Sequence, residues 1–112
     1  MKPIISFEEF NNIDIRIGTI IEVSDFPKAR KPAYKLVIDF GVLGLKKSSA
    51  QLTSLYSKDE LKGKKVSAIV NFKPRQIANF LSEVLVLGIQ NKDEVVLLKS
   101  SNQTVTNGEK VS

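Results

Sequence analysis

Apolar and polar residues alternate along several segments of this chain, a pattern typical of half-buried β-strands. From Ile13 to Val23 the apolar side chains fall on odd positions, so we expect one long strand with these odd residues facing a core. Gly18, near its middle, indicates a bend or a bulge. Similar patterns predict further strands over residues 34–40, 45–52, 66–72, 83–89 and 95–98.

Two short helices are predicted from their N-terminal signals. Ser6 followed by Glu9, and Ser57 followed by Glu60, have the spacing of a capping box, in which each side chain bonds the backbone N–H of the other residue. The first helix should cover residues 6–11, and Gly63 is placed to end the second. The tail from Ser100 is polar, with one turn predicted at Asn107-Gly108.

This order of elements predicts an all-β fold, namely a five-stranded OB-fold Greek-key barrel. A short helix precedes the first strand, and a second short helix lies between strands three and four. With 112 residues, the chain is expected to form one domain over residues 1–112. OB-folds bind ligands through the face of strands two and three and through the one-two and four-five loops. Here those loops would be residues 26–31 and 73–81.

Composition narrows the chemistry. The chain has neither cysteine nor histidine, which excludes disulfides, thiolate chemistry, imidazole general bases and zinc ligation by these residues. No glycine-rich phosphate loop occurs. We therefore expect a binding protein with no catalytic residues, metal or cofactor, and not an enzyme. No apolar run has membrane-spanning length and no signal peptide is evident, so a cytoplasmic protein without membrane insertion is expected.

Charge is concentrated in the middle of the chain. Between Phe26 and Ser82 there are twelve cations and three anions, a net charge of +9, whereas the two ends together carry −4. Such a centre attracts polyanions or acidic protein surfaces. For the loop cations at 28–31 and 73–75, ligand binding and simple solvation are both open interpretations. Prolines at 27, 32 and 74 stiffen these loops.

The segment from Asn71 to Gly88 combines cations with an amide and two exposed-looking aromatics, Phe72 and Phe80. These groups suit either a phosphate backbone with stacked bases or an extended peptide. For Phe72 a place in the barrel core is favoured, and for Phe80 a pocket or dimer contact. Asn71 and the Ser82-Glu83 pair have a structural alternative, in which they satisfy backbone groups or orient the loop.

Several blocks of this sequence resemble the tRNA-binding domain family, the OB-fold module found in methionyl-tRNA synthetase tails. The opening block is Asp14-Ile15-Arg16-Ile17-Gly18-Thr19-Ile20, and the resemblance extends from Phe7 through Lys110. It is closer to a branch of homodimeric, export-related chaperones, on the blocks at 28–36, 47–53 and 74–88. Where the family typically follows Ser-Glu with Gly-Met, this chain has Val84-Leu85, which favours the chaperone branch.

The resemblance implies a homodimer that binds unfolded or precursor polypeptides and is linked to the secretion machinery, with tRNA binding through the same basic surface as the alternative. The candidate apolar pocket or dimer-interface residues are Phe7, Phe10, Ile13, Phe72 and Phe80. The candidate nucleic-acid or polypeptide binding residues are Lys28, Arg30, Lys31, Lys35, Lys46, Lys47, Asn71, Lys73, Arg75, Ser82 and Glu83.

Overall fold

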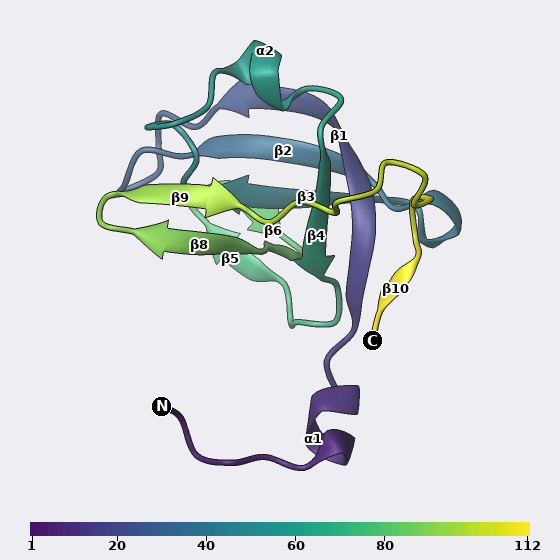
Figure 1. Ribbon diagram of the computed structural model, residues 1–112. Coiled ribbons are helices and arrows are strands. Elements are labelled where there is room, and N and C mark those ends of the chain that lie inside the picture. The colour runs from purple at the N-terminus through teal and green to yellow at the C-terminus, as the bar shows by residue number, and fades with distance from the viewer.

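The computed structural model describes residues 1–112, and its centre is a strongly bent antiparallel sheet that closes almost into a barrel (Figure 1). The strand order β3-β2-β1-β4-β7 and the helix between β3 and β4 confirm the predicted OB-type barrel. The barrel strands are β1 (Ile15–Asp25), β2 (Tyr34–Asp39), β3 (Leu45–Ala50), β4 (Lys65–Ile69) and β7 (Leu85–Val86).

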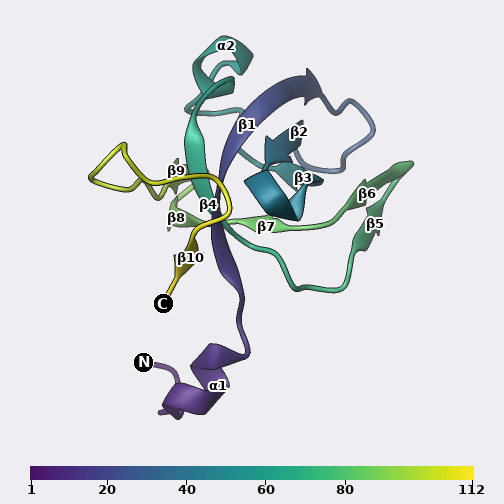
Figure 2. The same cartoon turned by 90° about the vertical axis from the view of Figure 1, so that its right-hand side faces the viewer.

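Both predicted capping boxes are formed. The helix α1 (Phe7–Asn11) begins where Ser6 Oγ accepts a hydrogen bond from Glu9 N at 3.1 Å, and Ser6 N donates one to Glu9 Oε1 at 3.0 Å. The helix α2 (Lys58–Leu61) is capped in the same way by Ser57 and Glu60. Neither helix combines the length and apolar character needed to cross a membrane. The α1 helix buries none of its residues and lies away from the barrel (Figures 1 and 2).

The predicted inward face of the first strand is wrong over its first half. The β1 side chain in the core is Ile20, which is fully buried, whereas Ile15 and Ile17 on the odd face are only half-buried. The pairing with β2 shifts register between Ile20 and Glu22, a β-bulge that lets Val23 pack against the core beyond it. The phase of the alternation therefore changes within one continuous strand.

The core fills the barrel from every strand and from α2. Alternate residues of β2 point inward as predicted, and Leu36, Ile38 and Phe40 have no solvent exposure. Phe40 lies just after β2 and precedes a single 3-10 turn (Gly41–Leu43). The other fully or nearly fully buried apolar side chains are Leu52, Leu61, Val66, Ala68 and Val84.

The second half of the chain is more divided than the sequence predicts. The expected loop at 73–81 contains a hairpin of β5 (Arg75–Ile77) and β6 (Phe80–Ser82), turning through Ala78 at a φ of +51°. The expected strand at 83–89 is split, because β7 is followed by a separate hairpin of β8 (Gly88–Asn91) and β9 (Glu94–Leu97).

The polar tail folds back over the barrel and ends in a short strand, β10 (Lys110–Val111), which pairs with β1. On the way, the Lys65 ammonium donates hydrogen bonds to the carbonyls of Gln103 and Val105. The Arg16 guanidinium donates to the Gly108 carbonyl at 3.0 Å. Two cations of the barrel therefore fix the predicted Asn107-Gly108 turn region against β1.

Gly18 is predicted to be indispensable for the core. A Cβ at this position would lie 2.6 Å from Ile38 Cγ2 and 2.8 Å from the Phe40 ring. We expect Gly18→Val to lower the free energy of unfolding by about 2 kcal/mol because the core must be displaced. Urea unfolding measures the change. The exposed Glu22→Ala on the same strand is the control, expected to change stability by less than about 0.5 kcal/mol; equal stability of both variants would contradict the packing argument.

Candidate ligand-binding face

The β2–β3 pairing decides which lysines share a surface. Residues opposite each other in an antiparallel pair lie on the same face, and Lys35 pairs with Ser49 while Lys47 pairs with Val37. Lys35 and Lys47 are therefore both on the outer face of the barrel. Lys46 pairs with the core residue Ile38 and lies on the other face, so the structure does not bring Lys46 together with Lys35 and Lys47.

A cluster of two aromatic rings and two ammonium groups joins the β1–β2 loop to the β5–β6 hairpin. The rings of Phe26 and Phe80 meet edge to face with centroids 5.4 Å apart. Lys35 Nζ lies 5.0 Å from the Phe26 centroid and 5.5 Å from the Phe80 centroid, and Lys47 Nζ is 5.5 Å from Phe80. These distances are those of cation–π contacts, which hold both ammonium groups at this face.

The sequence suggested that Phe80 is exposed, but the structure buries it. Its exposed fraction is 8%, and that of Phe26 is 4%. A base has no free ring face to stack on here, because the partner ring and the lysines cover Phe80. The place of Phe26 in this cluster was missed by the sequence analysis, which treated residue 26 only as the start of a loop.

Arg75 extends the same face. It pairs with Ser82 in the hairpin, and Ser82 Oγ accepts a hydrogen bond from Ser49 N at 3.0 Å. Ser49 stands opposite Lys35. Arg75 is therefore linked to Lys35 through Ser82 of the hairpin and Ser49 of β3. We call Lys35, Lys47 and Arg75 the basic face.

The cations of this region have no carboxylate partner. The two salt bridges in the structure, Asp14–Arg16 and Asp25–Lys58, involve none of the candidate binding residues. The predicted loop cations are all exposed, and their side chains make none of the structure's hydrogen bonds. These exposed cations are Lys28, Arg30, Lys31 and Lys73.

Ser82 and Glu83 complete the barrel wall. Glu83 exchanges two hydrogen bonds with Lys47, because Glu83 N donates to the Lys47 carbonyl at 2.8 Å and Lys47 N donates to Glu83 Oε1 at 2.9 Å. Next to them, the fully buried Ser48 hydroxyl donates to the Val84 carbonyl at 3.1 Å. The pair therefore has the structural role that the sequence left as an alternative: it ties β3 to the segment before β7.

Asn71 also has a structural role. Its Oδ1 accepts a hydrogen bond from Asp14 N at 2.9 Å and its Nδ2 donates to the Asn12 carbonyl at 2.7 Å, so the amide clamps the linker between α1 and β1. The next residue, Phe72, is 51% exposed. The preference for Phe72 in the barrel core is therefore wrong; β4 ends at Ile69, and the alternation does not continue beyond it.

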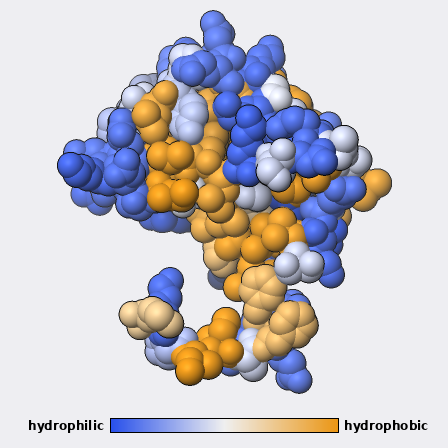
Figure 3. All heavy atoms as spheres, viewed as in Figure 1, coloured by the Kyte–Doolittle hydropathy of each residue, from blue (hydrophilic) through white to orange (hydrophobic).

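The candidate apolar residues do not form one pocket. Phe7, Phe10 and Ile13 lie in the N-terminal arm (residues 1–13), where Phe7 is 73% exposed and its ring centroid is 6.4 Å from that of Phe10. Phe80 instead packs against Phe26 beside the outer-face residues Lys35 and Lys47. Figure 3 shows apolar and polar side chains mixed along the arm, with open space between its N-terminal part and the barrel.

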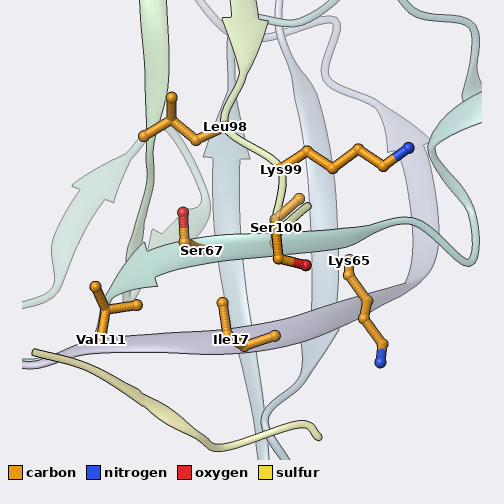
Figure 4. Close-up of a pocket in the computed structure, with 8 residues that line it drawn as sticks. Ile17, Lys65, Ser67, Leu98, Lys99, Ser100 and Val111 are labelled. Atoms are coloured by element: carbon orange, nitrogen blue, oxygen red, sulfur yellow. The ribbon is translucent and has the colours of Figure 1, made fainter. Parts of the chain in front are cut away.

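A shallow groove of about 200 Å³ lies on the outer surface of β1 and β4, beside the start of the tail (Figure 4). None of the candidate binding residues lines it. Nowhere does the structure gather three metal-ligating side chains. The groove is lined by Ile17, Lys65, Val66, Ser67, Leu98, Lys99, Ser100 and Val111.

Barrel, basic face and apolar arm together define a small OB-type binding module. Its family follows from comparison with known sequences: residues 15–110 match the model of the family described as "Putative tRNA binding domain", and the chain belongs to that family.

Two solved structures are similar to this chain over its whole length. The chaperone CsaA of Bacillus anthracis is 46% identical, with a TM-score of 0.92 over 98% of this chain and 100% of that one. The CsaA chaperone protein of Picrophilus torridus is 54% identical, with a TM-score of 0.91 over 97% of this chain and 100% of that one.

Curated relatives include much longer proteins. The methionine–tRNA ligase of Phocaeicola vulgatus is 36% identical over 114 aligned residues, which cover 99% of this chain and 16% of the ligase. The chain thus spans about one sixth of the length of such relatives.

Removal of the Glu83 carboxylate should destabilise the barrel. In Glu83→Ala the Lys47 N–H loses its acceptor, so we expect a decrease of about 1 kcal/mol in the free energy of unfolding, measured in urea. Glu83→Gln keeps an acceptor oxygen and should lose less. Unchanged stability of Glu83→Ala together with lost ligand affinity would show instead that Glu83 contacts ligand directly.

Proposed function

We propose that this protein is a chaperone that binds unfolded or precursor polypeptides in the cytoplasm and supports their export. The observation that carries the proposal is the end-to-end similarity to two CsaA chaperones, at 46% and 54% identity with both of those chains fully covered. The ligase relatives share only a module that makes up about one sixth of their length.

The distribution of apolar side chains supports a binding role. Ile4 is 97% exposed, and Ile5 and Phe7 are exposed as well. Their burial would contribute roughly 1.5–3 kcal/mol for each large side chain. The capping box stabilises α1, although α1 covers nothing on its own barrel. We therefore propose a homodimer in which the arm, with Phe7, Phe10 and Ile13, packs against a second copy.

Loss of the two arm phenylalanines should weaken this dimer. We expect Phe7→Ser with Phe10→Ser to shift the protein from dimer to monomer at micromolar concentration, as measured by sedimentation equilibrium. Val42→Ser is the control, since Val42 is 98% exposed and lies outside the arm. A wild-type monomer, or a double variant that stays dimeric, would contradict the arm-mediated interface.

A second candidate function is structure-selective tRNA binding, favoured by the unpaired cations of the basic face. Lys35 and Lys47 are held at one surface by aromatic rings, Arg75 stands opposite Ser82 in the adjoining β5–β6 hairpin, and none of the three forms a salt bridge with a carboxylate. Such a face suits phosphate groups. With Phe80 covered, recognition would rest on backbone and shape instead of stacking on this ring.

A salt titration separates the two functions. Polypeptide binding by apolar burial should change little between low and moderate salt, whereas tRNA affinity should fall log-linearly with salt concentration. In a Lys35, Lys47 and Arg75 triple alanine variant, we expect the tRNA salt slope to drop by about two to three and polypeptide affinity to persist.

The matched control replaces Lys62, Lys92 and Lys99 by alanine, which removes the same charge from other surfaces. Tight, salt-steep tRNA binding without any polypeptide binding would show that the chaperone proposal is wrong. Equal slopes in the two triple variants would show that the basic face is not the tRNA site.

A further inference from the structure

The β8–β9 hairpin is a two-stranded sheet of its own, in which β9 faces Tyr56, whose hydroxyl accepts a hydrogen bond from Leu97 N, while the outer edge of β8 is free. All four residues of β8 are exposed, and β8 pairs with β9 and with no other strand. In an antiparallel ladder, hydrogen-bonded pairs alternate with pairs that do not bond each other. The residues of the second kind direct their backbone N–H and C=O groups away from the partner strand. Asn91 and Glu94 flank the two-residue turn, and Leu98 N donates to the Leu87 carbonyl. In this phase, Gly88 and Gln90 present their backbone groups to the free edge.

This edge lacks the features that usually prevent strand addition. Natural edge strands are protected by charged side chains, proline or bulges. The β8 sequence Gly-Ile-Gln-Asn contains no charge and no proline, and its pairing with β9 has no register shift. Among the protective features, only its short length applies.

Apolar side chains border the edge. Val95 and Leu97 of β9 pack against the barrel core, so Val96 and its cross-strand neighbour Ile89 face away from it. Ile89 is 55% exposed and the following Leu98 is 40% exposed. Figure 3 shows an apolar patch over these two strands. Free backbone groups beside apolar side chains match what an extended apolar segment presents.

We propose that the outer edge of β8 takes up an extended, uncharged polypeptide segment as an added strand, at a site separate from the basic face. This deepens the proposed chaperone function and rests on it. Figure 2 shows the β8–β9 and β5–β6 hairpins on opposite sides of the barrel, so the two sites do not overlap.

The arm of a second copy fits this edge poorly. Pro3 has no N–H to donate to a ladder, and Ser6 N is already bonded to Glu9 Oε1. Between Pro3 and Ser6 only Ile4 and Ile5 have a free N–H, and adjacent residues of a strand direct these groups to opposite sides, so this stretch offers a single residue to the edge. A client segment has no such limit on its length.

Gln90→Pro tests the proposal because it removes the N–H that points to the free edge and leaves the β9 ladder intact. The probe is a short, neutral, fluorescent peptide in which valine alternates with serine, followed by anisotropy. We expect about tenfold weaker binding by Gln90→Pro, unchanged binding by Gln90→Thr, and wild-type binding by the Lys35, Lys47 and Arg75 triple variant. Circular dichroism and sedimentation of both Gln90 variants should match the wild type.

Three results would overturn the β8 site: equal peptide binding by Gln90→Pro and Gln90→Thr, lost peptide binding in the basic-face variant, or an altered oligomeric state in Gln90→Pro alone. An altered oligomeric state in Gln90→Pro alone would show that the β8 edge pairs with a second copy of the chain. The proposed function fails as a whole if the wild-type protein binds neither this peptide nor an unfolded protein. If it binds them and Gln90→Pro does so equally, only the β8 site is wrong.

Discussion

The barrel depends on a few hydrogen bonds that join β3 to residues 82–84. No continuous ladder connects β3 with β7, so the Ser82 hydroxyl and the Glu83 carboxylate bond the backbone of β3 in its place. Ser82 also belongs to the β5–β6 hairpin and thereby anchors it. The positions of Arg75 and of the Phe80 ring follow from this closure, and Phe80 in turn holds the two lysine ammonium groups. The geometry of the basic face is thus a consequence of the hydrogen bonds that close the barrel between β3 and residues 82–84.

The basic face and the β8 edge occupy different parts of the surface. Cations gather around β2, β3 and the β5–β6 hairpin, where Leu45, Phe72 and Leu81 are exposed as well, while the uncharged β8 strand lies on the opposite side of the barrel. The separation means that polyanion binding and polypeptide binding need not compete for the same residues.

Local sequence signals predicted an element correctly where a single local interaction or pattern determines it. The Ser6–Glu9 and Ser57–Glu60 boxes are such cases, and so is the regular alternation of β2. These signals failed where contacts between distant residues determine the local structure. Ile20 and Ile21 are both apolar, so the phase change at the bulge left no trace in the pattern. The turn at Ala78 adopts a positive φ without glycine, and the two-residue β10 is too short to show any periodicity.

The candidate site was predictable in outline only. Position in an OB barrel predicted a shared surface for Lys35, Lys47 and Arg75, because strand order and loop position follow from the order of elements; in the structure Lys35 and Lys47 meet at the Phe80 ring. The roles of Asn71 and Glu83 were not decided by the sequence, since an amide or a carboxylate at a strand end serves ligand and backbone equally well. Only the distances to Asp14 N and Lys47 N show which backbone groups they bond.

The tail strand has a consequence for how the chain acquires its structure during synthesis. β1 pairs with β2 and β4, and its first residues also pair with β10, where Ile15 stands opposite Val111. Chains emerge from the ribosome N-terminus first, and contacts between distant residues form slowly. Gly108 follows Arg16 by 92 positions, so the hydrogen bond from Arg16 to the Gly108 carbonyl forms only after that stretch has been made. During that interval the edge of β1 at Ile15 and Arg16 is open to other chains, and the pairing with Lys110 and Val111 is what closes it.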